Sequence, residues 1–312
     1  MTRAPLRLLG VVAAASILVV AAAPALAEEV ADVIERVHAS TYAANRLTVS
    51  IWAGETRVVR ERVEHADGQE MVRTDETWSM KGGGRAITMS DAPSGIAFMM
   101  TPDPIETSRY EVGETTSVTH MRRDCTLIPI LEDGAVRAHM VVDDRTGAPL
   151  ITYIYDGDGS VFRTISLSDF APHRMYEWPD DYEDVPVEIV MHHEANVVPN
   201  EAAGYELVDV FPGPAGSEQG FYSDGLFSFS LFAFKGEASV AGFEDPMAFV
   251  GSSGIYDMVP TAKDVRLTWT DGQRRYVLVG DLPPDHLDEV LADLPAQDSA
   301  GMFARWWRRV FG

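Results

Sequence analysis

The chain has 312 residues, of which 46% are apolar and 23% charged, values that fit globular domains and disfavour disordered or fibrous proteins. Its 48 acidic residues outnumber its 25 basic ones and give a formal charge of −23, so nucleic acids, whose phosphates need a basic surface, are not expected as partners. The single cysteine, Cys125, excludes an intrachain disulfide framework and a cysteine-based zinc cluster.

The N-terminus has the three parts of a secretory signal peptide. Arg3 and Arg7 supply positive charge, residues 8–20 form an apolar run, and Ala25 to Ala27 match the small-residue cleavage pattern. The alternative is a transmembrane anchor, but the run is short for a bilayer span and ends in a processing site. The residue directly after the cleavage point is Glu28 rather than a cysteine, which argues against a lipoprotein. We therefore expect residues 1–27 to be a signal peptide and the mature protein to be exported.

The first part of the mature protein shifts from a helical to a β pattern. Residues 28–38 carry apolar side chains at helical spacing, whereas Leu47, Val49 and Ile51 alternate with polar residues as in a half-buried strand. Short turns and apolar runs then recur up to about residue 170. Because short turns join antiparallel neighbours, residues 28–176 are expected to form a domain with a large, strongly curved antiparallel sheet.

An acidic segment separates this domain from a second one. Residues 177–188 contain six acids, two prolines and no basic residue, so we interpret residues 177–199 as an interdomain linker. Residues 200–297 follow with alternating strands, a hairpin signal at Asp271-Gly272, and a helix after Pro283 for which Asp285 is the expected N-cap. The overall expectation is an α+β protein with a large and a smaller antiparallel sheet.

No motif in the sequence indicates a catalytic, metal or cofactor site. The segment His192-His193-Glu194 lacks the spacing of a zinc helix, and the serines of residues 251–254 do not match a nucleophile elbow. The aspartate pairs lie in turns or in the linker, where aspartate is favoured for local hydrogen bonds. Cys125 opens an apolar strand and is interpreted as a small buried hydrophobe. We therefore expect a binding protein rather than an enzyme.

The C-terminal residues 298–312 form the one basic segment of an acidic protein. On a helical wheel their apolar and basic side chains lie on opposite sides, which is typical of an amphipathic helix with aromatic anchors. One interpretation is peripheral contact with an anionic membrane or a partner's groove, and the alternative is a helix docked on the second domain. The residues assigned to a membrane-facing tail are Phe303, Arg305, Trp306, Trp307, Arg308 and Arg309.

Several stretches resemble one protein family. Residues 222–230, YSDGLFSFS, resemble the signature strand of the RseB/MucB family, the extracytoplasmic regulators of envelope-stress sigma factors. Residues 277–284 are similar to the closing strand and helix start of that family, and residues 123–125 with 143–150 resemble the end of its N-terminal domain. His65, after an arginine-rich strand, also fits the pattern.

This resemblance implies both a fold and a function. The first domain would resemble the lipoprotein carriers LolA and LppX, an unclosed barrel whose concave side takes acyl chains, and the second would be the main contact for an anti-sigma factor. The protein would bind the extracytoplasmic region of that membrane-spanning anti-sigma factor, in the periplasm or at the outer face of the cytoplasmic membrane. It would shield this partner from proteolysis until a lipid or mislocalised lipoprotein releases it.

The resemblance also suggests where partner and lipid bind. Phe227 and Phe229 alternate with serines and are expected to face the core, so Tyr222 and Asp224, which border this strand, are the predicted partner contacts. A methionine-rich group is predicted to line the lipid cavity, the alternative being a packed core in which methionines fill gaps. The predicted cavity residues are Ile87, Met89, Ile96, Phe98, Met99 and Met100.

Two other functions compete with the regulator. A lipid or lipoprotein carrier of the LolA/LppX type would use the first domain for transport and the second for docking. A secreted hydrolase would need a catalytic pair that the sequence does not contain. A gene neighbourhood with a sigma factor and a single-pass anti-sigma factor would favour the regulator over the carrier.

Overall fold

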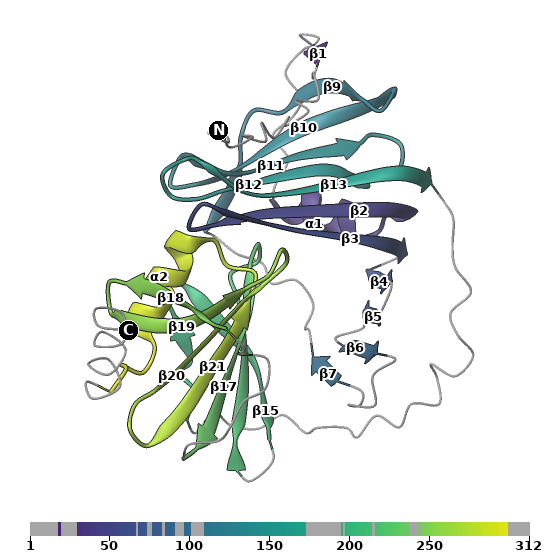
Figure 1. Ribbon diagram of the computed structural model, residues 1–312. Coiled ribbons are helices and arrows are strands. Elements are labelled where there is room, and N and C mark those ends of the chain that lie inside the picture. Colours follow the sequence, from purple (N-terminus) through teal and green to yellow (C-terminus); the bar gives the residue numbers. More distant parts are fainter. Residues whose placement is uncertain are drawn as a thin grey trace, which may run out of the picture.

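The computed structural model shows two antiparallel sheets, each of which carries one of the two described helices (Figure 1). The described residues are 18–19, 30–66, 68–73, 77–82, 85–90, 97–100, 109–172, 195, 197–213, 216–236, 243 and 245–298. For 18–19, 31, 77–82, 85–90 and 97–100 the description covers the backbone alone.

The first sheet joins two meanders of the chain. Its strands are β1 (Leu18–Val19), β2 (Thr41–Trp52), β3 (Glu55–Ala66), β4 (Gln69–Arg73), β5 (Thr77–Gly82), β6 (Arg85–Ser90), β7 (Ala97–Met100), β8 (Tyr110–Val112), β9 (Thr116–His120), β10 (Arg123–Glu132), β11 (Ala135–Asp143), β12 (Pro149–Tyr155) and β13 (Val161–Pro172). Among the described strands the order is β1-β9-β10-β11-β12-β13-β2-β3-β4-β5-β6-β7, and β8 pairs with β10. The pairing of β13 with β2 joins the meanders, and the outermost strands do not meet, so the sheet is not closed.

Helix α1 (Val30–His38) lies against this sheet and fills part of its interior (Figure 1). Val30 and Val33 are buried in the same cluster as Trp52 of β2 and Phe162 of β13, whose rings meet edge to face with centroids 4.9 Å apart. This cluster fixes the helix to β2, β10 and β13, because burial of apolar surface is the main favourable term in folding. The predicted helix and the predicted large open antiparallel sheet are therefore confirmed.

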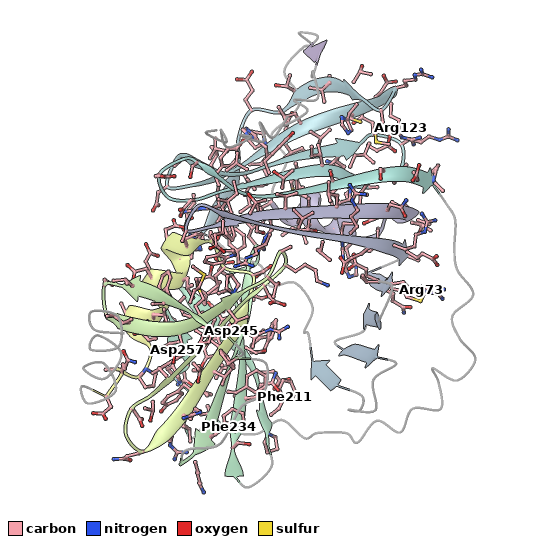
Figure 2. All side chains as sticks on the ribbon, viewed as in Figure 1. Arg73, Arg123, Phe211, Phe234, Asp245 and Asp257 are labelled. Carbon is pink, nitrogen blue, oxygen red and sulfur yellow. The ribbon has the colours of Figure 1, made fainter. Side chains whose placement is uncertain are left out.

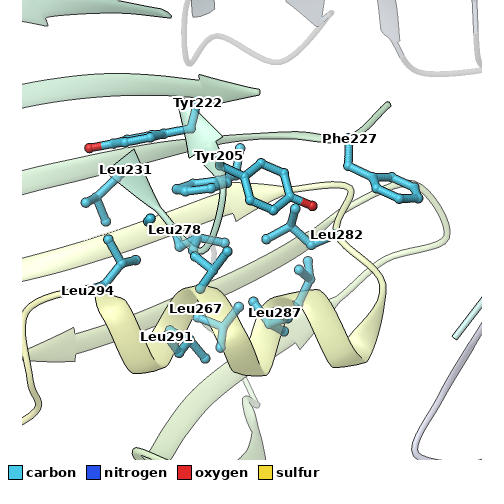
Figure 3. Packing of buried hydrophobic residues seen from close by; sticks show 14 of the residues in the cluster. Tyr205, Tyr222, Phe227, Leu231, Leu267, Leu278, Leu282, Leu287, Leu291 and Leu294 are labelled. Carbon is cyan, nitrogen blue, oxygen red and sulfur yellow. The ribbon is translucent and has the colours of Figure 1, made fainter. Parts of the chain in front are cut away.

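The second sheet is smaller. It contains β14 (Glu201–Ala202), β15 (Tyr205–Pro212), β16 (Glu218–Ser223), β17 (Ser228–Lys235), β18 (Met247–Gly251), β19 (Gly254–Pro260), β20 (Val265–Thr270) and β21 (Arg274–Gly280). The described strands follow the order β14-β15-β16-β17-β21-β20-β19-β18. Helix α2 (Pro284–Asp293) covers one face, where its Leu287 and Leu291 pack near Leu231, Leu267 and Leu278 of the sheet (Figure 3). The predicted second antiparallel sheet with one helix is confirmed.

The hairpin between β20 and β21 forms as predicted. Gly272 has φ +90°, a conformation that favours glycine, and the carboxylate of Asp271 accepts the backbone N–H groups of Gln273 and Arg274. These bonds hold the pairing of β20 with β21 in register.

The N-cap prediction for α2 is wrong. Pro283 occupies the cap position and the helix has no side-chain cap, because Pro284 begins it with a preset φ and no N–H group that needs a partner. Asp285, the predicted cap, instead accepts a hydrogen bond from Arg137 of the first sheet.

The predicted linker and tail lie mostly outside the described residues. β13 ends at Pro172 and β14 begins at Glu201, with residues 173–194 and 196 not described. Val198 is buried beside Gly220 of β16, and the carbonyl of Pro199 accepts from the Tyr222 hydroxyl, so the last residues assigned to the linker pack on the second sheet. The tail beyond Asp298 is not described, and the domain bounds remain predictions. Within the described part of the protein, no helix combines the length and apolar character needed to span a bilayer.

Candidate functional site at the junction of the two sheets

A continuous apolar cluster crosses from one sheet to the other. It includes Val33, Trp52 and Ile130 of the first half of the chain together with Phe227 and Leu287 of the second. Tyr110 of β8 meets Phe227 edge to face, with ring centroids 6.5 Å apart and an interplanar angle of 79°. The two sheets therefore share one core rather than touching through a solvated gap.

A buried hydrogen bond joins the same two regions. The hydroxyl of Tyr110 donates to Oδ2 of Asp224 at 2.5 Å, and both residues are nearly inaccessible, at 6% and 3% exposure. The other oxygen of Asp224, Oδ1, accepts the N–H groups of Leu226 and Phe227. Burial, and then the charge of Asp224, raise the pKa of Tyr110 far above its ordinary value. The tyrosine is therefore a donor, and Asp224 both shapes the turn before β17 and binds the first sheet.

Beside this bond lies a network centred on Glu132 of β10 and His286 of α2. Arg109 donates from Nε to Oε1 of Glu132 at 2.5 Å and from Nη1 to the carbonyl of Ala203 at 2.8 Å. His286 has Nε2 2.9 Å from Oε2 of Glu132 and Nδ1 2.7 Å from the hydroxyl of Tyr205. The network thus connects β10 and the residue before β8 with β15 and α2.

Opposing effects act on the pKa of the Glu132 carboxyl. Burial alone would raise it, but the hydrogen bonds and charges of His286 and Arg109 outweigh burial and lower the pKa to about 2. Glu132 is therefore an anion at neutral pH, and its charge is compensated by groups from both sheets.

A third polar contact holds the start of α2. Arg137 donates from Nε to Oε2 of Glu132 at 2.7 Å and from Nη1 to Oδ2 of Asp285 at 2.8 Å. The backbone N–H of Asp285 donates to Oδ1 of Asp156, in the turn between β12 and β13, at 3.2 Å. The first turn of α2 is therefore bound to the first sheet through Asp285, which contacts Arg137 and Asp156.

A separate group of contacts lies where β2 and β13 meet the loop before β20. Ser50 donates to the carbonyl of Ala262 at 2.6 Å and accepts from Nε of Arg163 at 2.9 Å, and Nη1 of Arg163 donates to the carbonyl of Asp281 at 3.1 Å. Arg163 is 3% exposed, and its burial lowers the pKa of its guanidinium from the ordinary value. In the described part of the protein no carboxylate lies within salt-bridge distance of it.

A neighbouring ion pair completes this group. The buried carboxylate of Glu61 on β3 lies 2.6 Å from Nζ of Lys263 in the second half of the chain and 3.0 Å from Nη2 of Arg46. Buried ionic and polar groups need defined partners, so they penalise other arrangements of the same surfaces. The arrangement can therefore fix the orientation of the two sheets relative to each other.

The partner contacts predicted from sequence are not at the surface. Tyr222 is fully buried, stacks on Phe229 with centroids 4.6 Å apart, and donates to the carbonyl of Pro199 at 2.6 Å. Asp224 is buried because Tyr110 and its own turn satisfy its carboxylate. In this structure both side chains are therefore bound inside the protein, and their contact with a partner stays an untested prediction.

Other sequence interpretations agree with the structure. Phe227 and Phe229 are 2% and 1% exposed, as expected for core residues. Cys125 is buried on β10, and burial raises the pKa of its thiol to about 11, as expected for a small hydrophobe. Asp143 accepts from Arg123 and Thr146, which confirms the structural role proposed for aspartates near turns.

The predicted lipid cavity and tail are not tested by the described side chains. β6 and β7 pair in a register that places Ile87 opposite Phe98, but the side chains of Ile87, Met89, Phe98, Met99 and Met100 lie outside the description, as does the whole of Ile96. The tail residues Phe303, Arg305, Trp306, Trp307, Arg308 and Arg309 and the segment His192-His193-Glu194 also lie outside it.

Sequence reasoning missed the junction itself. Arg109 and His286 are 177 residues apart, and Glu132 and His286 are 154 apart, so no local spacing brings them together. One usable signal is a single charged residue at the end of an apolar strand. Glu132 follows the apolar run of residues 127–131, and a carboxylate in such a place needs either a buried partner or solvent.

The comparisons with known proteins give similarities of fold. No family model and no curated protein matches the chain. One protein of the Pseudomonas aeruginosa MucA/MucB complex is similar, with TM-score 0.48 and 13% identity over 86% of this chain and 97% of that one. MucB in complex with MucA(peri) gives TM-score 0.46 and 13% identity over 86% and 99%. A LolA superfamily protein from Nitrosomonas europaea gives TM-score 0.26 and 10% identity over 50% and 97%. At these low values we draw no functional conclusion from the similarities.

Proposed function

We propose that this protein is an exported regulator that binds the extracytoplasmic region of a membrane-spanning anti-sigma factor. By shielding that region from proteolysis it would restrain an envelope-stress sigma factor. The observation that carries the proposal is residues 222–230, which resemble the signature of the RseB/MucB regulators and span the end of β16, the turn at the junction and the start of β17. Within that stretch Phe227 and Phe229 build the core and Asp224 binds the first sheet.

The junction supports this proposal because it holds two sheets as one binding surface. Contacts from Tyr110, Glu132, Arg163 and Glu61 reach across it at separate points. A partner segment that contacts both sheets would bind at a lower cost in conformational entropy, because the sheets are already fixed relative to each other before binding. Binding would then depend on residues that never touch the partner.

We further propose that the first domain senses a lipid or a lipoprotein. The sheet is large and open, as an acyl-binding hollow requires, and β6 and β7 at its far end carry the predicted cavity residues other than Ile96. Native mass spectrometry and lipid extraction of the purified protein are expected to find bound lipid, and fluorescent fatty acid is expected to bind. Absence of all three signals would contradict lipid sensing and leave a packed core.

The binding proposal is tested by capture from solubilised membranes. The protein without residues 1–27, immobilised through a tag, is expected to retain a single-pass anti-sigma factor that mass spectrometry identifies. Tyr110→Phe should retain less of it, whereas Tyr153→Phe, which removes a hydroxyl from β12 beside an apolar cluster separate from that of the junction, should retain as much as the unchanged protein. Retention of lipoproteins without any anti-sigma factor would support a LolA/LppX-type carrier instead.

A further inference from the structure

A small cavity opens at the end of the second sheet that is remote from the junction. Its volume is about 260 Å³, and its walls come from the connection between β15 and β16 and from the ends of β17 and β21. Phe211 and Phe234, which precede wall residues Pro212 and Lys235, mark this end of the sheet in Figure 2. The cavity is therefore distinct from the junction and from the predicted lipid-binding region.

Two cations meet at this cavity. Lys235 and Arg274 both line it and are directly opposed in the register of β17 and β21. Like charges in directly opposed positions of a sheet repel each other. Within the described residues neither forms a salt bridge, and Nη1 of Arg274 is shielded from solvent without a hydrogen-bond partner. An anionic acceptor placed between them would relieve the repulsion and satisfy this donor.

The charge and size of the cavity favour a single carboxylate. Among the residues that line the cavity, Lys235 and Arg274 are cationic and Glu218, which is 5% exposed, is the one anion, so the lining carries one positive charge in excess. That excess matches a carboxylate better than a phosphate, which carries about 1.5 to 2 negative charges at neutral pH. The planar guanidinium of arginine also fits the two oxygens of a carboxylate. Val197 and Pro212 supply an apolar wall for an aliphatic stem, and the volume admits a side chain rather than a whole lipid.

Two glycines keep the cavity open. A Cβ atom added to Gly213 would lie 2.2 Å from Oγ of Ser217, and one added to Gly216 would lie 2.9 Å from Nζ of Lys235. Gly216 also has φ +71°, a conformation that strains other residues. At Gly213 and Gly216 the connection between β15 and β16 therefore places no side chain in front of Ser217 and Lys235.

We propose that this cavity binds one carboxylate of a peptide segment, with Lys235 and Arg274 as its cationic partners. The carboxylate belongs to an acidic side chain or to the C-terminus of a peptide, since both present the same two oxygens on a short stem. The identity of the peptide as part of an anti-sigma factor rests on the proposed function, but the carboxylate site does not.

Three short peptides test the site by NMR. The probes are acetyl-Gly-Glu-Gly-amide, the matched acetyl-Gly-Gln-Gly-amide, and acetyl-Gly-Gly-Gly with a free carboxyl end. One or both carboxylate peptides are expected to give saturating shifts of the Gly216 and Ser217 amide signals, and the glutamine peptide is not. Saturation by the first or the third peptide distinguishes a side-chain carboxylate from a terminal one. Equal shifts with the glutamine peptide, or none with either carboxylate, would overturn the site.

Variants locate the interaction. Arg274→Gln and Lys235→Gln should each weaken carboxylate binding by about tenfold or more, the loss that accompanies removal of one charge-assisted hydrogen bond. Arg275→Gln removes the same charge one residue along β21, from the opposite face of the strand, and should bind as the unchanged protein does. Dispersed amide spectra verify folding, and Lys235 is exposed at a strand end, so its variant will fold. Equal weakening in all three variants would contradict the proposal.

The two proposals fail separately. The probe peptides contain no anti-sigma factor sequence, so absence of carboxylate binding leaves capture of the membrane partner unaffected. Conversely, a carrier that captures no anti-sigma factor would still bind these peptides through Lys235 and Arg274.

Discussion

The hydroxyl of Tyr110 and the carboxylate of Asp224 form a 2.5 Å hydrogen bond between residues 114 positions apart. Tyr110 begins β8 of the first sheet, and Asp224 lies in the turn that leads into β17 of the second. Because both are buried, water cannot replace either partner. The turn that resembles the family signature is thus held in place by the other sheet.

Removal of this donor should destabilise the protein without reshaping its core. Tyr110→Phe keeps the ring against Phe227 but leaves an oxygen of Asp224 without this partner, which should lower the free energy of unfolding by about 1–3 kcal/mol. Urea denaturation followed by circular dichroism measures the change. Tyr153→Phe on β12 is the control and should stay within about 0.5 kcal/mol. Equal stability of the two variants would show that the bond does not hold the sheets.

The phenyl ring of Phe229 should act in the core. It is 1% exposed between Tyr205 and Tyr222, so Phe229→Ala should cost about 3–5 kcal/mol and unfold the second sheet. Phe232→Ala, a half-buried ring on the other side of the strand, should cost less. Thermal unfolding of both variants measures the difference. An unchanged unfolding profile for Phe229→Ala together with lost partner binding would instead make this strand a contact surface.

Acid should loosen the junction through Glu132. Its pKa is lowered to about 2 in the folded protein, against about 4.3 in an unfolded chain, so its contribution is full above pH 4.5 and is lost as the pH falls towards 2. Glu132→Gln lacks this titration, so its stability should decline less than that of the unchanged protein across this interval. Glu111→Gln, at an exposed position of β8, should follow the unchanged protein. Denaturant titrations at several pH values give the profiles, and parallel profiles for all three proteins would refute the assignment.

The basic tail is expected to meet anionic membranes. Residues 299–312 contain three arginines and no acid, and each arginine would contribute about 1 kcal/mol at such a surface, with Trp306 and Trp307 at headgroup level. A truncated protein ending at Asp298 keeps the contact of that residue with Thr270 and removes only the tail. Co-sedimentation with anionic vesicles and a blue shift of tryptophan emission should occur for the full-length protein alone. Equal sedimentation of both forms without a blue shift would leave the tail as a docked structural helix.

Sequence patterns predicted strands and turns because the interactions that form them join residues close together in the sequence. Alternation in residues 227–231 placed Phe227 and Phe229 inside, and Asp271-Gly272 predicted the hairpin through turn geometry. The junction was not predictable, because Glu132 meets His286 only through the pairing of distant strands. Asp224 illustrates the limit: an aspartate in a turn suggests a solvent-exposed group, and its burial depends on Tyr110 of the other sheet as well as on its own turn. The same holds for Asp285, whose partner Arg137 lies in the other sheet.

The central claim is that the two joined sheets bind the extracytoplasmic region of an anti-sigma factor. Isothermal titration calorimetry of the protein without residues 1–27 against that purified region tests it most directly. We predict saturable binding by the unchanged protein and by Tyr153→Phe, and weaker binding by Tyr110→Phe at a temperature where all three are folded. No measurable binding by the folded, unchanged protein would contradict the account. Equal binding by all three proteins would show that partner binding does not depend on the hydrogen bond between Tyr110 and Asp224.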